Sequence, residues 1–354
     1  MSFRKFLGIG LEAAKSNVTV LDKPYKLNFA ITYWCNSRCV TCNIWKMPKP
    51  KNELTLQEIQ NFAKKNNYFK WVELTGGEPF LRSDIAEIAK AFAENLNGLY
   101  VLTIPTNSLP NRDLILQKIG QILDLGIPRV VITLSLDGYA ELHDRIRGIS
   151  GNYAKVIALA ESLHELQKSH KGFSFIFGYT ISKYNVGMLQ STIAHVKQEL
   201  PWATANMFHV NIGQVSDAYY NNSNADFVAK PEQIAGDIEY LISQRKISKD
   251  PVQIIEGAFL KGLVEFVKSG RQPISNRNLE LSIFLDSVGN VFPSIMWNEI
   301  LGNIRNTDYS LEPILQSEKA KEIRLLSSQG KEPIAWTSCD AYQAIAGNLK
   351  SLLF

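Results

Sequence analysis

The chain has 354 residues, of which 45% are hydrophobic and 20% are charged, and its formal net charge is only +4. The length leaves room for one large α/β domain with an appendage, and the small net charge argues against a nucleic-acid partner. The apolar runs are too short to span a membrane, and four cysteines with three of them clustered exclude a disulfide framework, so we expect a cytoplasmic protein with reduced thiols.

Residues 1–24 are predicted to form an N-terminal helical segment. Its apolar residues recur on one face at helical spacing and are Phe3, Phe6, Leu7, Leu11 and Ala14. Arg4 and Lys5 lie beside this face, and Gly8 and Gly10 weaken the helix. We expect the helix to pack on the main domain. The alternative is a helix that lies on a membrane surface.

Between residues 25 and 228, short β-branched or aromatic runs alternate with amphipathic stretches. Strands are predicted at 27–33, 69–75, 99–105, 129–136, 173–181 and 205–211. Helices are predicted at 54–66, 84–95, 111–124, 152–168 and 187–199, with N-caps at Thr55 and Ser83. Six such units predict a parallel sheet, and the best architecture is a partial (β/α)6 TIM-like barrel with its reactive groups on the loops after the strands.

Residues 229–354 are predicted to form a small α+β C-terminal extension. The preceding segment Gly213–Lys230 is polar and rich in turn residues, so it is either a lid or a linker. Helices are predicted at 231–245 and 252–269. A hairpin is predicted from 279–285 and 290–293.

Three cysteines follow the first predicted strand within eight residues: Cys35, Cys39 and Cys42. This spacing lets one loop place a thiolate on each of three irons of an iron–sulfur cluster, which leaves the fourth iron open. A structural zinc site would need a fourth ligand, for which only Cys339 or a distant histidine is available. Three unrelated buried cysteines are the remaining alternative.

The second predicted strand ends in the turn Gly76-Gly77-Glu78-Pro79. The glycines allow positive φ and a close approach of the backbone to a ligand. Carbonyl groups and a carboxylate in such a turn suit an ammonium group. A plain turn is the alternative.

Together, Cys35-x3-Cys39-x2-Cys42 and Gly76-Gly77-Glu78-Pro79 resemble the radical S-adenosylmethionine (radical SAM) superfamily. The resemblance implies that the three cysteines hold a [4Fe–4S] cluster, whose open iron is chelated by the amino and carboxylate groups of S-adenosylmethionine. It also implies that Gly76, Gly77 and Glu78 hold S-adenosylmethionine. Thr41 stands where many members have an aromatic residue, so Ile44 or Trp45 would have to supply the adenine contact.

The resemblance extends to later strands. Residues 131–138 and 143–148 are similar to the fourth-strand signature of the peptide- and sugar-modifying branch. This implies that Ser135 and Asp137 bind the ribose hydroxyls and that Arg147 binds the carboxylate of S-adenosylmethionine. A helix cap with a surface arginine is the alternative. Thr106-Asn107 resembles a Thr-Asn-Gly turn with Ser108 in place of glycine, and Asn107 would face the cofactor pocket or the substrate. Further candidates for the barrel mouth are Tyr179, Asn185, His209, Asn211 and Gln214.

Residues 284–293 and 301–304 resemble the start of a cysteine-rich extension that binds auxiliary clusters in peptide-maturing members. Here Ser294 replaces the usual cysteine, and of the later cysteines only Cys339 remains. This implies a degenerate extension on the substrate side without an auxiliary cluster. Cys339 is either an inert buried thiol or a hydrogen-atom donor of the kind found in the family's epimerases.

The resemblance therefore implies an enzyme that reductively cleaves S-adenosylmethionine at a single cluster and abstracts a hydrogen atom from a substrate. We expect a small molecule such as a sugar, a nucleotide-sugar or a lipid-like compound, with an epimerase or dehydrogenase outcome. An external ferredoxin- or flavodoxin-like electron donor is required. A peptide-modifying maturase is the first alternative, disfavoured because the first strand begins near residue 27 and leaves no room for an N-terminal peptide-recognition domain. A non-catalytic zinc or iron–sulfur protein is the second.

Overall fold

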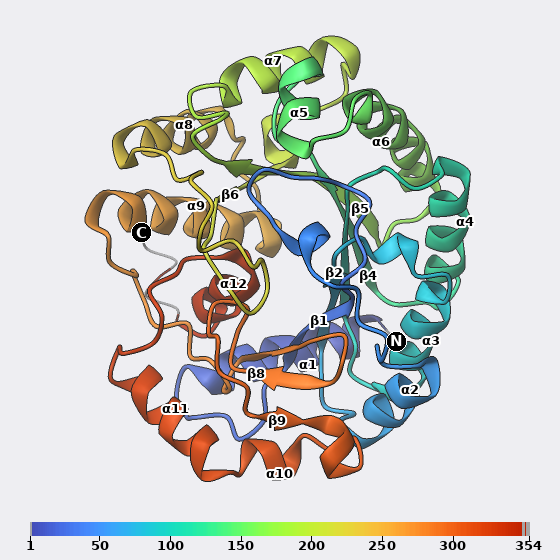
Figure 1. The fold of residues 1–354 in the computed structure, drawn as a ribbon, viewed down its shortest axis with the longest axis vertical. Helices are drawn as coiled ribbons and strands as arrows, with labels where there is room; N and C mark the ends of the chain where they lie inside the picture. The colour runs from blue at the N-terminus through green and yellow to red at the C-terminus, as the bar shows by residue number, and fades with distance from the viewer. Residues whose placement is uncertain (1, 349–350, 352–354) are drawn as a thin grey trace.

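The computed structural model describes residues 2–348 and 351. Within this part of the chain, six parallel strands with helices between them form the main sheet (Figure 1). In chain order they are β1 (Lys26–Thr32), β2 (Trp71–Gly76), β3 (Val101–Thr106), β4 (Arg129–Ser135), β5 (Phe173–Ile181) and β6 (Phe208–Ile212). The predicted partial (β/α)6 barrel is confirmed. Residues 205–207, predicted as the start of the sixth strand, instead form a 3-10 turn.

Helices cover the outer face of this sheet. They are α2 (Leu56–Lys65), α3 (Ile85–Asn95), α4 (Arg112–Leu123), α5 (Ala140–Arg147), α6 (Asn152–Ser169) and α7 (Leu189–Glu199). Thr55 caps α2 in a capping box with Glu58, as predicted. The predicted N-cap at Ser83 is wrong, because the N-cap position of α3 is occupied by Asp84. The Asp84 carboxylate pairs with Arg82 at 2.8 Å and makes no capping hydrogen bond.

The two faces of the strands differ in burial, and this difference positions the site. In β4, Val130, Ile132 and Leu134 are fully buried under the helices, whereas the alternating residues are only partly buried. The partly buried face lines a cavity at the centre of the barrel. Because successive side chains of a strand point to opposite faces, every second residue of these strands is presented to that cavity.

The C-terminal segment adds to the same sheet. It contains α8 (Pro231–Gln244), α9 (Pro251–Ser269), β7 (Ser282–Leu285), β8 (Asn290–Phe292), β9 (Gly302–Asn303), α10 (Glu312–Leu315), α11 (Glu318–Ser328) and α12 (Ser338–Ala346). β7 pairs in parallel with β1, and β8 and β9 continue the sheet in antiparallel order. The predicted hairpin strand therefore begins at Ser282 and not at Leu279, because Arg277 and Leu279 have positive φ that a strand does not allow. α12 lies inside the ring of outer helices (Figure 1).

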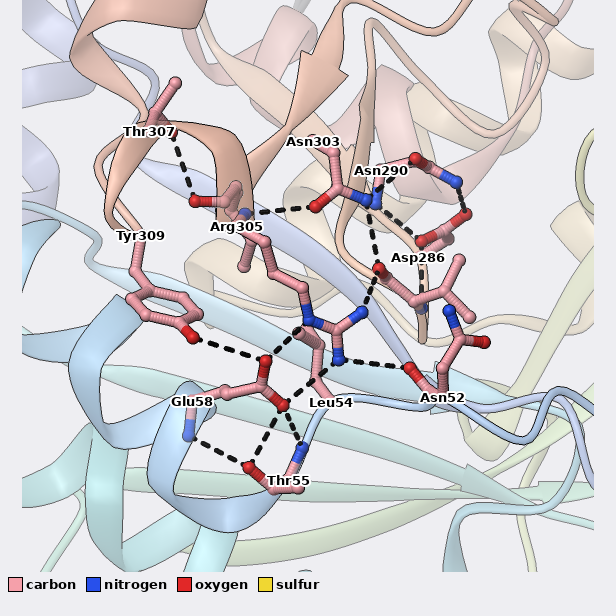
Figure 2. Close-up of polar contacts among 12 residues, drawn as sticks. Asn52, Leu54, Thr55, Glu58, Asp286, Asn290, Asn303, Arg305, Thr307 and Tyr309 are labelled. Carbon is pink, nitrogen blue, oxygen red and sulfur yellow. Dashed lines mark hydrogen bonds and ion pairs between the residues drawn. The ribbon is translucent and has the colours of Figure 1, made fainter.

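One arginine fastens the C-terminal segment to the first crossover helix (Figure 2). Arg305 pairs with Glu58 at 2.5 Å and also donates to the carbonyl oxygens of Val288 (3.0 Å) and Asn52 (3.1 Å). Its hydrogen bond lowers the pKa of Glu58 to about 2. The Glu58 carboxylate also closes the capping box with Thr55. Glu58 therefore links the start of α2, through Arg305, to the turn after β7.

The helix α1 (Ser2–Ser16) packs on the protein, partly with a different side from the one predicted. Ile9 packs against a small buried cluster around Tyr25, and the Ser16 carbonyl accepts a hydrogen bond from Arg277 at 2.7 Å. Phe3, Leu7 and Leu11 are exposed. The expectation that the helix packs on the main domain is confirmed, but the contacts come from Ile9, Ser16 and Phe6, whose ring lies 5.6 Å from that of Tyr100. Within the described residues, helices long and apolar enough to cross a membrane are absent.

Candidate active site

The three clustered cysteines lie on the loop after β1, and the end of α5 holds this loop in place. The backbone N–H groups of Arg38 and Val40 donate to the carbonyls of Arg147 and Ile146, each at 2.9 Å. Gly148 ends α5 with φ +69°, and a Cβ there would lie 2.5 Å from the Arg38 carbonyl oxygen. The loop therefore depends on a helix more than one hundred residues away in sequence.

Cys39 is buried, and Cys35 and Cys42 are partly buried. Burial, with a smaller contribution from the neighbouring Cys39, raises the pKa of Cys35 to about 11 and of Cys42 to about 12. The Cys39 sulfur lies 3.1 Å from the Ser37 hydroxyl. Thiols of this kind stay protonated near neutral pH and lose their protons when a metal binds.

The cysteines are not preassembled around a single ion position in the described part of the chain. In the part of the chain that the structure describes, His, Cys, Asp and Glu side chains form no group of three placed to hold one metal ion. Zinc needs all its ligands about 2.0–2.3 Å from a single ion. Three thiols that each bind a different iron do not need to converge on one point. Cys35, Cys39 and Cys42 stay the residues predicted to hold a [4Fe–4S] cluster.

The Gly76-Gly77 turn packs directly on the cysteine loop. The N–H groups of Gly77 and Glu78 donate to the carbonyls of Thr32 (2.8 Å) and Trp34 (2.7 Å). Gly76 has φ +135°, and a Cβ on it would lie 2.0 Å from the Thr32 carbonyl oxygen. The glycines were predicted to allow close approach of a ligand, but the close approach seen here is to the backbone of the neighbouring loop.

Replacing Gly77 by alanine is therefore expected to disturb the cysteine loop. The new Cβ would lie 2.1 Å from the Trp34 carbonyl oxygen and 3.1 Å from the Cys35 Cβ, so the two loops must separate. Overpacking of this kind costs about 1–3 kcal/mol, which urea unfolding would measure, and iron content after anaerobic reconstitution should fall. The matched control is Gly120→Ala within α4, where a Cβ meets nothing within 4 Å and should stabilise the helix by up to about 1 kcal/mol. Equal stability of the two variants would contradict this reading of the turn.

Glu78 joins the end of β2 to the end of β3. Its carboxylate accepts hydrogen bonds from the Asn107 N–H (2.6 Å), the Thr106 hydroxyl (2.9 Å) and the Phe80 N–H (3.1 Å). Burial raises the pKa of this carboxyl to about 7 despite these donors. Three protein donors already occupy the carboxylate. The carbonyls of Gly76 and Glu78 also accept hydrogen bonds, from the Tyr219 hydroxyl and the Leu81 N–H (each 3.1 Å), so among the described residues the Gly77 carbonyl is the more open acceptor for an ammonium group.

Asn107 lies against the cysteine loop, and its predicted contact with the cofactor or the substrate stays a prediction. Its amide nitrogen donates to the Asn36 side chain at 2.9 Å and lies 3.8 Å from the Cys35 sulfur. Its backbone carbonyl accepts from Asn152 at 2.9 Å. The following residue, Ser108, has φ +62° and a buried hydroxyl without a hydrogen-bond partner among the described residues.

Ser108→Gly is expected to raise the free energy of unfolding by about 1 kcal/mol. A left-handed conformation costs a non-glycine residue about 1–2 kcal/mol, so glycine removes this cost. Glycine also increases the conformational entropy of the unfolded chain, which offsets about half of the gain in stability. Removal of the unpaired hydroxyl adds to the gain. Ser108→Ala removes the hydroxyl but keeps the strained φ, so thermal unfolding should rank glycine above alanine. The reverse order would contradict the strain argument.

Asp137 and Arg147 form a buried ion pair beside the cysteines. Arg147 Nε lies 2.7 Å from Asp137 Oδ2, and an Nη atom lies 3.7 Å from the Cys39 sulfur. Asp137 Oδ1 accepts from the Thr180 N–H at 2.8 Å. Burial alone would lower the pKa of Arg147, but Asp137 and Cys39 raise it overall, so it stays charged. The alternative of a surface arginine is wrong, and the predicted cofactor contacts of both residues stay predictions.

Segment 213–230 covers the cysteine loop from the other side. The Tyr219 hydroxyl donates to the Gly76 carbonyl at 3.1 Å and lies 2.9 Å from the Thr75 hydroxyl. The Tyr220 carbonyl accepts from the Asn43 N–H at 2.9 Å. This segment is therefore a cover packed on the site and not a plain linker.

All predicted site residues line one cavity of about 1310 Å3. These residues are Cys35, Cys39, Cys42, Gly76, Gly77, Glu78, Asn107, Ser135, Asp137, Arg147 and Cys339. Thr41 and Ile44 line it too, whereas Trp45 points its indole N–H at the Cys39 carbonyl (3.2 Å). Of the two predicted replacements for the adenine contact, Ile44 lines the cavity and Trp45 does not, and the contact itself stays a prediction.

The candidates for the barrel mouth separate into two groups. Tyr179, His209, Asn211 and Gln214 line the cavity. His209 is held by Glu256 on α9, with 3.1 Å between Nδ1 and a carboxylate oxygen. Asn185 does not line it. Its amide nitrogen donates to the carbonyls of Asp137 and Thr180, each at 2.9 Å, so it joins two loops instead.

Sequence reasoning missed the polar centre of the barrel. Lys26 is fully buried, donates to the Cys339 carbonyl at 2.6 Å and lies 4.0 Å from a Glu73 carboxylate oxygen. The Cys339 thiol lies 3.8 Å from the other oxygen of Glu73. Asn28 pairs in register with Glu73 on the neighbouring strand. The sequence held one signal for this centre. Lys26 and Asn28 stand two apart in the otherwise mostly apolar run 26–32, so both side chains lie on the same face of the strand.

Comparison with known proteins agrees with this geometry. Residues 29–193 match the model of the radical SAM superfamily. The AdoMet-dependent heme synthase of Methanosarcina barkeri is 25% identical over 315 residues, which cover 82% of each chain. The GTP 3′,8-cyclase of Lactiplantibacillus plantarum is 34% identical over 155 residues, which cover 39% of this chain and 42% of that protein.

Two solved structures share the fold. Streptococcus suis SuiB bound to S-adenosylmethionine has a TM-score of 0.61 at 16% identity, covering 89% of this chain and 70% of that one. anSMEcpe with bound AdoMet and the Cp18Cys peptide has a TM-score of 0.58 at 18% identity, covering 93% of this chain and 96% of that one.

Proposed function

Because this chain is a radical SAM enzyme, we propose that it removes a hydrogen atom from a small molecule held inside its barrel. When bound, a [4Fe–4S] cluster and S-adenosylmethionine supply the hydrogen-abstracting radical in this superfamily. The observation that carries the proposal is the single cavity that contains both the three cysteines and Cys339. At about 1310 Å3 it exceeds the roughly 300–1,000 Å3 of a pocket for one ligand. It therefore has room for the cofactor and a second small molecule.

The cavity lining favours a polar substrate such as a sugar or nucleotide-sugar. Four lining residues have buried oxygens without a hydrogen-bond partner among the described residues: Asn28 Oδ1, Asn211 Oδ1, Thr337 Oγ1 and Gln343 Oε1. The Glu73 carboxylate adds a charged acceptor beside them. Buried oxygens of this kind cost free energy unless a partner binds them, and the hydroxyl or amino groups of a substrate would do so.

Cys339 is the residue that we assign as hydrogen-atom donor. It packs against the same apolar cluster as Cys35 and Cys42, and burial followed by the charge of Glu73 raises the pKa of its thiol well above the usual range. The thiol therefore keeps its hydrogen. In the assigned step, the S–H bond breaks, a C–H bond forms on the substrate radical, and a thiyl radical remains. A ferredoxin- or flavodoxin-like protein returns one electron to it and the solvent returns one proton.

Cys339→Ser is expected to stop the reaction after hydrogen abstraction. The test incubates the reconstituted enzyme in D2O with a low-molecular-mass cell extract and follows both 5′-deoxyadenosine and deuterium in the product. The wild type should form a product with one solvent deuterium on carbon, because the thiol hydrogen exchanges with water. The variant should form 5′-deoxyadenosine without that product. Unchanged product from the variant would remove Cys339 from the mechanism.

The same assay separates the substrate classes. Stimulation of 5′-deoxyadenosine formation by the low-molecular-mass fraction supports a small-molecule substrate. Stimulation by a peptide fraction alone would overturn that proposal in favour of a peptide maturase, although the enzyme would still be a radical SAM enzyme.

A further inference from the structure

The helix α1 presents an apolar stripe to solvent. Phe3, Leu7 and Leu11 follow one another every four residues and are 72%, 46% and 67% exposed. We call these three residues the α1 stripe. The helix is attached to the protein through Ile9 and Ser16, so the stripe is not needed to hold it in place. Exposed apolar residues that cluster on one helix face indicate a surface that something else covers.

The charges around the α1 stripe are positive. Arg4 and Lys15 are exposed and form no ion pair with any described residue. Glu12, the one acidic residue of the helix, is half-buried and acts on the buried Tyr25 hydroxyl, so it lies toward the protein. The outward side of α1 is therefore apolar, with cations along one edge of the α1 stripe. This is the composition of helices that lie in the interface of an anionic bilayer.

The position of α1 leaves the stripe free to face a flat surface. The Phe6 ring lies 5.6 Å from the ring of Tyr100, the residue just before β3, so the helix lies at the amino ends of the strands. The cysteine loop follows the carboxyl end of β1, at the opposite end of the barrel. The central cavity reaches from Cys35 to Phe6 and Ile9, so contact with a surface at α1 does not cover the cysteines.

We propose that α1 holds this protein on an anionic membrane surface, with the α1 stripe among the headgroups and with Arg4 and Lys15 on lipid phosphates. Charge complementarity selects this occupant over a second copy of the chain. Two copies joined stripe to stripe would bring the same cations into opposition, whereas acidic headgroups neutralise them. The proposal does not depend on which substrate the barrel binds.

Vesicle sedimentation of the reconstituted full chain tests the proposal. The wild type should bind vesicles of phosphatidylcholine with phosphatidylglycerol more strongly than vesicles of phosphatidylcholine alone. High salt should release the protein from the vesicles. The double variant Leu7→Glu with Leu11→Glu should bind at least about tenfold less, because both charges fall within the apolar contact. Arg4→Glu with Lys15→Glu should lose the preference for the acidic lipid.

The matched control is Leu114→Glu with Leu325→Glu, two partly exposed leucines on α4 and α11. This variant carries the same added charge elsewhere and should bind like the wild type. Failure of the wild type to bind the acidic vesicles would overturn the proposal, as would equal loss in the control. Analytical ultracentrifugation tests the other occupant. If the wild type does not bind vesicles but forms a dimer, and the Leu7→Glu, Leu11→Glu variant is a monomer, the α1 stripe binds a second copy instead.

Discussion

Cys35→Ala is expected to lose the iron–sulfur cluster and, with it, the cleavage of S-adenosylmethionine. Three thiols on one loop are the proposed cluster ligands, and in the cavity that they line the next thiol, Cys339, is engaged with Glu73. Loss of a ligand should lower metal affinity or activity by more than the roughly 10- to 100-fold decrease that follows loss of an outer-shell partner. Iron and sulfide content after anaerobic reconstitution, and 5′-deoxyadenosine formed under reduction, measure the two effects.

The fourth cysteine supplies the control for this prediction. Cys339→Ala removes a thiol from the same cavity but leaves the cysteine loop intact, so it should keep its iron and its basal cleavage of S-adenosylmethionine. Full iron content in Cys35→Ala would contradict the assignment of the ligands. Stoichiometric zinc without iron in the wild type would contradict the cluster itself.

The cysteine loop and the glycine turn could be predicted because their chemistry is local in sequence. Each motif spans fewer than ten residues, and each follows a strand whose apolar run is easily recognised. The carboxyl ends of parallel strands meet at one edge of a sheet, so these two loops had to be neighbours. The structure adds the reason for the glycines, which is the contact of Gly77 with the Trp34 carbonyl.

Other features depend on contacts between distant segments and left little local signal. β7 pairs with β1 across more than 250 residues, and its short run resembles any hairpin strand. α5 has eight residues, and its N-cap Tyr139 makes no side-chain capping bond, so neither length nor cap revealed it. The inward face of β1 carries Lys26 and Asn28. Polar residues at these positions argue against a fully buried strand when the sequence pattern alone is considered. They are tolerated there because Lys26 donates to the Cys339 carbonyl and lies near Glu73, whereas Asn28 lines the central cavity.

Residue Asp137 is expected to matter for stability as much as for binding. Arg147 is almost completely enclosed, and Asp137 is the carboxylate that neutralises it, at 2.7 Å. Asp137→Ala leaves this guanidinium buried without a counter-charge and also leaves the Thr180 N–H without an acceptor. Removing one partner of a buried pair costs about 3–5 kcal/mol, so urea unfolding of the cluster-free protein should show a loss of this size at an unchanged m-value.

Two controls separate the buried pair from charge effects in general. Asp226→Ala breaks the exposed pair with Lys183 and should cost at most about 1 kcal/mol, because water screens that interaction. Asp137→Leu combined with Arg147→Met removes both buried charges, and the pair of changes should cost less than Asp137→Ala alone. A double variant less stable than the single one would show that Arg147 is held mainly by its contacts with the cysteine loop. In that case Asp137 would be a secondary partner, and the stability of the site would originate in the cysteine loop itself.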